Sequence, residues 1–122
     1  MSEINSYRDL VAWQQAIELA VAVYDHTKQW PKEELYGLTS QVRRAAVSVA
    51  ANIAEGYGRD NLGSYVQFLR IAQGSLKEVE THVLIAERVG ILNAINAQSV
   101  LQQTETVGKI LRALIRKLSE GL

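Results

Sequence analysis

The chain has 122 residues, of which 48% are hydrophobic and 21% charged, and its 13 basic residues balance its 13 acidic ones. This composition is typical of a single globular domain, and a net charge of zero gives no general argument for nucleic-acid binding. Because the sequence contains no cysteine, it excludes disulfides, thiolate metal sites and thiol catalysis.

The first of four segments with helical periodicity is expected at about residues 9-28, with Asp9 as its N-cap. Further apolar residues widen its apolar stripe, which indicates a second neighbour for this helix. Pro31 ends the segment and then opens a short turn of helix. The residues that we expect to face the core are Leu10, Trp13, Ile17, Val21 and Tyr24.

The other three helices are expected at about residues 39-56, 61-89 and 93-119, separated by glycine-containing connections. Short connections between long helices imply antiparallel neighbours. The sequence therefore predicts an all-α single domain, residues 1-122, that folds as an up-down-up-down antiparallel four-helix bundle. The main structural alternative is a bundle with a broken first loop. The expected core stripes of the second to fourth helices are Leu38, Val42, Ala46, Val49 and Ile53; Tyr65, Phe68 or Leu69, Ala72, Leu76, Val79, Val83 and Ala86; and Val100, Leu101, Thr104, Val107, Leu111, Leu114 and Leu118.

A narrow row of polar residues lies on the second helix, which is otherwise small and apolar. Serine and asparagine are mildly unfavourable in a helix interior, so their presence suggests that the row faces another part of the protein. Antiparallel packing would place this row opposite the third helix. We predict a polar seam between the two helices, and the alternative is that the row is a solvated face. The residues assigned to the seam are Arg44, Ser48, Asn52, Glu55, Arg70, Ser75 and Glu78.

Three local expectations follow from this seam. Arg44 should contact Ser75 or Glu78, and the network prediction fails if Arg44 has no partner. Glu55 stands in the last turn of its helix, where the helix dipole disfavours a negative charge, so it needs a donor such as Arg59, Ser64 or Arg70. Gly74 costs roughly 1 kcal/mol in mid-helix relative to alanine, and close approach of the two backbones would explain it.

Positive charge is concentrated near the end of the chain, because Glu120 is the only acid after Glu105. Several cations at helical spacing could contact successive phosphates of a nucleic acid, and an oligomer would multiply that surface. The alternative is that cations near a helix C-terminus simply favour the helix dipole. The candidate nucleic-acid contacts are Arg43, Lys109, Arg112, Arg116 and Lys117.

Three motifs resemble one bacterial family: LVAWQQA at residues 10–16, YGLTSQVRRAAVSVAANIAEG at residues 36–56, and FLRIAQGSLKEVET at residues 68–81. They are similar to the four-helix-bundle proteins encoded in intervening sequences of large-subunit ribosomal RNA genes. A related branch is the accessory variability determinant of diversity-generating retroelements. The resemblance covers nearly the whole chain, with Ala50 standing where many relatives carry proline.

The resemblance implies a bundle that assembles into a ring, typically a homopentamer, with a basic surface and no established enzymatic activity. For the retroelement branch it implies RNA or DNA binding and association with a reverse transcriptase. The neutral charge of this chain weakens the nucleic-acid inference.

No catalytic constellation, phosphate loop or nucleophile motif stands in the sequence, so we expect no enzyme, no metal, no cofactor and no small-molecule substrate. Glu78 and His82 are four residues apart, a spacing compatible with metal ligation but more often an ordinary surface pair. We also expect a cytoplasmic location and no membrane partner, because the sequence has neither a signal peptide nor a run of membrane length. Two main hypotheses remain: an oligomeric bundle that binds RNA or DNA, and a protein-interaction scaffold without nucleic-acid binding. An enzyme or metal protein that uses Glu78 and His82 is a distant third.

Overall fold

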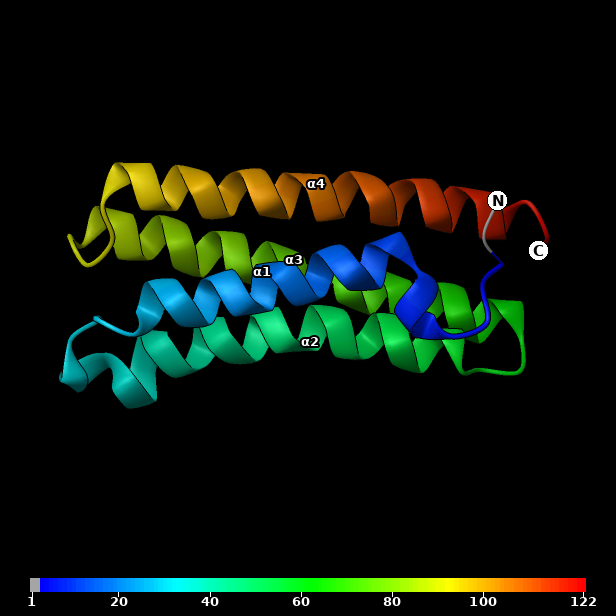
Figure 1. Cartoon of the computed structure of the whole chain (residues 1–122), viewed down its shortest axis with the longest axis horizontal. Helices are drawn as coiled ribbons and strands as arrows, with labels where there is room; N and C mark the ends of the chain where they lie inside the picture. Colours follow the sequence, from blue (N-terminus) through cyan, green and yellow to red (C-terminus); the bar gives the residue numbers. More distant parts are fainter. Residues whose placement is uncertain (1–2) are drawn as a thin grey trace.

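The computed structural model describes residues 3–122, which contain four long α-helices and no strand. Successive helices run in opposite directions, so that the first long helix begins and the last one ends at the same end of the bundle (Figure 1). Each helix packs against two others, so that α1 neighbours α2 and α4, and α3 neighbours the same two. The predicted all-α four-helix bundle is therefore confirmed. The helices are α1 (Val11–Thr27), α2 (Ser40–Tyr57), α3 (Leu62–Arg88) and α4 (Ala94–Ser119).

A short 3-10 turn, Tyr7–Asp9, precedes α1 and changes the role expected for Asp9. The carboxylate of Asp9 accepts hydrogen bonds from the backbone nitrogens of Asn5 (2.9 Å) and Ser6 (3.1 Å), so it closes a capping box on this turn. Helix α1 begins two residues later, and its N-cap, Leu10, supplies no side-chain hydrogen bond. The prediction that Asp9 caps the first long helix is wrong, because its carboxylate is used one turn earlier.

The connection from α1 to α2 contains a 3-10 turn, Lys32–Glu34, directly after Pro31, as expected. A wide helical turn, Leu35–Thr39, follows and is kinked at Gly37, whose backbone angles are not helical. The chain therefore reverses direction through two short helical turns before α2 begins at Ser40.

Side-chain caps fix the starts of α3 and α4. The side chain of Asn61 accepts from the nitrogen of Ser64, and that of Asn93 accepts from the nitrogen of Asn96, each at 2.8 Å. Helix α3 ends in a Schellman motif, in which Gly90 has a φ of 82° and the nitrogen of Ile91 donates to the carbonyl of Ala86. The glycine predicted just past the end of the third helix therefore fits a left-handed position that favours glycine.

One continuous core runs along the bundle axis and is made mostly of small and β-branched side chains. The stripes expected on α2, α3 and α4 face this core. Leu38, Tyr65, Leu101, Leu114 and Leu118 are partly buried at its margin. The largest side chains that are fully buried are Leu19, Ile53, Leu69 and Leu111.

The stripe predicted for the first helix is wrong at Val21 and Tyr24 only, because Leu10 belongs to the core and Trp13 and Ile17 pack against it. Val21 and Tyr24 remain 54% and 43% exposed, while Trp13 and Ile17 are only partly buried. Apolar residues surround much of α1, so a period of 3.6 residues does not select one face. Most of the residues of α1 that face the core are small, and their size lets α1 approach α2 and α4 closely. The residues of α1 that are buried are Ala12, Ala16, Leu19, Val23 and Thr27.

A close approach between α2 and α3 occurs at Gly56 and not at Gly74. A Cβ atom placed on Gly56 would lie 2.8 Å from the Cβ of Phe68, closer than real side chains pack. A Cβ atom on Gly74 would meet nothing within 4 Å. The close approach predicted at Gly74 is therefore wrong, because Gly74 lies on an exposed part of α3.

Candidate nucleic-acid interface

The cationic side chains of α4 lie on its solvent side over its last three turns. Lys109, Arg112, Arg116 and Lys117 are all exposed, and the last two belong to the final turn of the helix. Lys109 pairs with Glu105 at 3.3 Å, one turn earlier on the same helix. Within residues 3–122, the other three have no acidic partner within 4.0 Å. Arg112, Arg116 and Lys117 together form the cationic end of α4.

Arg43 does not belong to this surface, contrary to the sequence-based prediction. Its Nε donates to the Oγ1 of Thr27 at 2.8 Å, and its guanidinium lies 4.6 Å from the centre of the Tyr24 ring. Both partners belong to α1, and Arg43 itself is only partly exposed. The prediction of a phosphate contact is replaced by a structural role, because the packing of α1 on α2 brings a hydroxyl and an aromatic face to this guanidinium.

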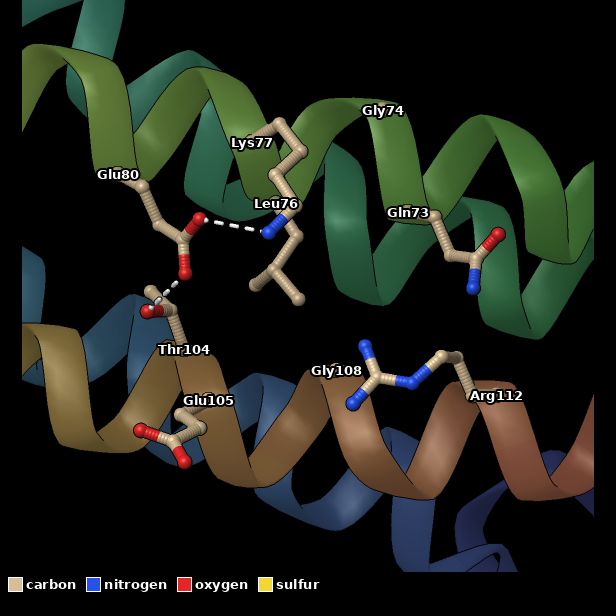
Figure 2. A pocket seen from close by; sticks show the side chains of 9 residues that line it. All are labelled: Gln73, Gly74, Leu76, Lys77, Glu80, Thr104, Glu105, Gly108 and Arg112. Atoms are coloured by element: carbon tan, nitrogen blue, oxygen red, sulfur yellow. Dashed lines mark hydrogen bonds and ion pairs between the residues drawn. The ribbon is translucent and has the colours of Figure 1, made fainter.

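A groove of about 340 Å³ lies between α3 and α4, next to the cationic end of α4. Figure 2 shows the guanidinium of Arg112 reaching back over Gly108 in the space between the helices, with Gln73 facing it from α3. The absence of a side chain on Gly108 keeps this space open. The residues that line this α3/α4 groove are Gln73, Gly74, Leu76, Lys77, Glu80, Thr104, Glu105, Gly108 and Arg112.

One end of the α3/α4 groove is closed by a chain of hydrogen bonds between the two helices (Figure 2). Glu80 accepts from the fully buried Thr104 at 2.8 Å and from Lys77 at 3.0 Å. The Thr104 hydroxyl also lies 2.8 Å from the carbonyl of Leu101. Since a hydroxyl has a single proton, Thr104 donates to only one of these two acceptors at a time.

The polar seam between α2 and α3 contains a compact cluster of hydrogen bonds. The hydroxyls of Ser48 and Ser75 lie 2.8 Å apart, and either one can donate. The amide of Asn52 donates to the carbonyl of Ser48 at 2.8 Å and to its hydroxyl at 2.9 Å. Ser75 is only 7% exposed, so this cluster satisfies polar groups that would otherwise be costly to bury.

The charged members predicted for the seam do not join this cluster. Arg44 is exposed and forms no hydrogen bond or ion pair with the residues that the structure describes. The predicted contact of Arg44 with Ser75 or Glu78 is therefore wrong. Arg70 is likewise exposed and lies away from Ser75 around α3. Long charged side chains at the margin of two packed helices are solvated instead of being drawn into the contact. Glu55 forms a long ion pair with one of its expected partners, Arg59, at 3.9 Å.

Glu78 and His82 line a second hollow, which lies over Ser48 and Ser75 and has a volume of about 340 Å³. The Nδ1 atom of His82 is buried and has no hydrogen-bond partner among the described residues. In the described part of the chain, no three histidine, cysteine, aspartate or glutamate side chains are grouped so that they could hold a metal ion. Glu78 and His82 therefore have no third ligand among these residues. None of the helices in residues 3–122 has the length and hydropathy needed to span a membrane.

Comparison with known proteins identifies the family. Residues 8–113 match the family described as 23S rRNA-intervening sequence protein. The chain belongs to this family. No curated protein matches it. Among solved structures, it is similar to a protein of unknown function from the S23 ribosomal protein family of Bacteroides thetaiotaomicron VPI-5482, with 20% identity, a TM-score of 0.78, and coverage of 86% of this chain and 98% of that one. At this identity the likeness supports the fold alone.

For this member of the 23S rRNA-intervening sequence protein family, sequence reasoning found the cations of α4 but missed the groove beside them. Gln73 and Glu80 are polar residues on the flank of an amphipathic helix, where periodicity gives them no special role. The signal that the sequence contained was Gly108, which lies in the middle of the fourth helix as Gly74 lies in the middle of the third. A mid-helix glycine indicates either close packing or an open space, and its surroundings decide between the two.

Proposed function

We propose that this protein is a non-enzymatic, oligomeric four-helix bundle that binds RNA or DNA through the cationic end of α4. The observation that supports this proposal best is the set of three exposed cations, Arg112, Arg116 and Lys117, without acidic partners in the described chain. Unpaired cations at helical spacing suit contacts with successive phosphates. A cytoplasmic location and a relationship to the retroelement accessory proteins remain parts of the same proposal.

The oligomeric part of the proposal, a homopentameric ring, rests on the family resemblance. It is also favoured by apolar side chains on the outer side of α1, where Val11 and Val21 are more than half exposed. Light scattering at micromolar concentration tests it, and a monomeric mass would remove the assembly. A Val21→Asp substitution is expected to lower the assembly state without unfolding the chain, because this position lies outside the core.

Salt-dependent binding of labelled RNA and DNA tests the nucleic-acid part. Replacing Arg116 or Lys117 with glutamine is expected to weaken binding to all sequences and to lower the salt slope by about 1 for each lost phosphate contact. The matched control is Lys28→Gln, which removes one charge at the opposite end of the bundle, where Lys28 pairs with Asp25 at 3.4 Å. Absence of binding at low salt by the assembled protein would refute the proposal.

The second candidate function is a protein-interaction scaffold, which the exposed apolar side chains of α1 favour. It predicts assembly or partner binding that depends on Val11 and Val21 and is insensitive to Arg116 and Lys117. Since assembly through α1 is common to both candidates, nucleic-acid binding separates them. Only the first candidate predicts such binding and its loss when Arg116 or Lys117 is replaced.

A further inference from the structure

We propose that the α3/α4 groove receives one unstacked guanine base of a single-stranded RNA or DNA, while the neighbouring phosphates lie along Arg116 and Lys117. This inference rests on the proposed function and specifies the form of nucleic acid that the same site would take. Three properties of the groove support it: its open floor, its balanced charges and its position beside the cationic end of α4.

The floor of the groove is apolar and open at Gly108. A Cβ atom added there would lie 3.4 Å from the Cδ2 of Leu76 and 3.8 Å from a terminal nitrogen of Arg112, both ordinary contact distances. An alanine would therefore fit, and it would raise the helix propensity of this position. Since internal packing does not demand glycine here, the open space is available to something outside the chain.

The charges around the groove suit a neutral polar ring better than a phosphate. Lys77 and Arg112 bring two positive charges, and Glu80 and Glu105 bring two negative ones. A phosphate inside the groove would meet both carboxylates, whereas a base offers donors and acceptors on different edges. Guanine fits this distribution, because an arginine fork binds its O6 and N7 acceptors and a carboxylate can accept from its N–H groups.

Glu80 can accept from such a ligand without leaving a buried group unpaired. When the Thr104 hydroxyl donates to the carbonyl of Leu101, also at 2.8 Å, it releases Glu80 and remains hydrogen-bonded. The exchange needs only a rotation of the hydroxyl proton. The fully buried Thr104 therefore stays satisfied whether the groove is empty or occupied.

The position of the groove would let one nucleic-acid strand contact the protein through both a base and its phosphates. Arg116 lies one helical turn beyond Arg112, about 6 Å along the axis at 1.5 Å per residue. A strand whose base enters the groove would thus pass its backbone over Arg116 and Lys117. A paired base in a duplex is stacked and cannot enter without flipping, so the site selects single strands.

The test measures binding by fluorescence anisotropy at low salt, with both ribose and deoxyribose versions of each probe. The probes are a short pyrimidine single strand with one central guanine, the same strand with adenine, the all-pyrimidine strand, and the duplex of the guanine strand. We expect the guanine strand to bind about tenfold more tightly than the all-pyrimidine strand. We expect a similar advantage over the duplex.

Two substitutions test the groove itself. Arg112→Lys keeps the charge but loses the planar fork, and it is expected to abolish the guanine preference. Gly108→Ala places a methyl group on the floor and is expected to reduce the preference while the fold, followed by circular dichroism, is retained. The matched controls are Arg88→Lys, at the far end of α3, and Gly63→Ala, in its first turn, both outside the groove. These controls should keep the preference.

The outcomes separate this inference from the proposed function. If no probe binds, both are overturned. If all probes bind with the same affinity, or if Arg112→Lys and Gly108→Ala retain the guanine preference of the unmodified protein, the groove proposal is wrong and phosphate binding by the cationic end of α4 stands.

Discussion

The contact between Arg43 and α1 gives the sharpest stability prediction. Arg43→Ala removes a 2.8 Å charged hydrogen bond to Thr27 and a guanidinium 4.6 Å from the Tyr24 ring centre. A hydrogen bond to a charged group contributes about 1.5 kcal/mol and a partly exposed cation–π contact about 0.5 kcal/mol, so the expected loss is about 2 kcal/mol. For a chain of 122 residues, this corresponds to a fall in Tm of roughly 8 °C.

Urea unfolding followed by circular dichroism, at one fixed protein concentration, measures this loss. Arg116→Ala is the control, because that exposed cation has no acidic partner in the described chain, and its change should stay within about 0.5 kcal/mol. A double-mutant cycle with Thr27→Val isolates the hydrogen bond. Equal stability of the Arg43 and Arg116 variants, or a coupling energy near zero, would refute the reasoning. Arg43→Ala should also leave nucleic-acid affinity unchanged.

Three further predictions concern α2 and α3. Gly74→Ala should stabilise the protein by about 0.5–1 kcal/mol in thermal unfolding, whereas Gly56→Ala should destabilise it, because only the second methyl group collides with α3. Ser75→Ala should cost about 1 kcal/mol in urea unfolding, and most of that cost should vanish when Ser48 is already alanine. Burial, aided by a neighbouring tyrosine, raises the pKa of Tyr65 above its ordinary value of 10.0, so its contribution should be complete below pH 10 and lost as pH rises through the higher folded-state value. Tyr65→Phe should flatten that alkaline decline in an unfolding-versus-pH series, and an unchanged slope would contradict the assignment.

The fold could be predicted from the sequence where apolar residues occupy one face only. On α2, α3 and α4 the period of the apolar residues selects a single stripe, and the buried residues follow it. On α1 apolar residues occupy several faces, so the face that is buried depends on how closely α2 and α4 approach this helix. That distance is set by small residues on all the helices together, for example Ala16 on α1 and Ala46 on α2, both fully buried. Periodicity within one helix does not contain this information.

The site was harder to predict than the fold, because its contacts cross between elements. Arg43 meets Thr27 over a connection of two short helical turns, and no spacing rule places one opposite the other. Ser48 and Ser75 were easier, because the hairpin of α2 and α3 fixes their register directly. Glycines were the least predictable: Gly56, expected as part of a helix end, makes the close contact, and Gly74, expected to make it, faces open space.

The neutral charge of the chain limits how a single copy can bind nucleic acid. Lys109 is paired with Glu105 and Arg43 is held by α1, so the proposed phosphate contacts are limited to three cations at the end of α4. At about −0.7 per phosphate on a single strand, three contacts would give a salt slope no steeper than about −2. One such contact set gives weak binding at physiological salt. A ring that presents several copies to one strand would raise both affinity and slope without new contacts. The measured slope therefore reports assembly as well as binding: a value much steeper than about −2 requires several chains on one strand, and a value of about −2 or shallower indicates that only one chain is engaged.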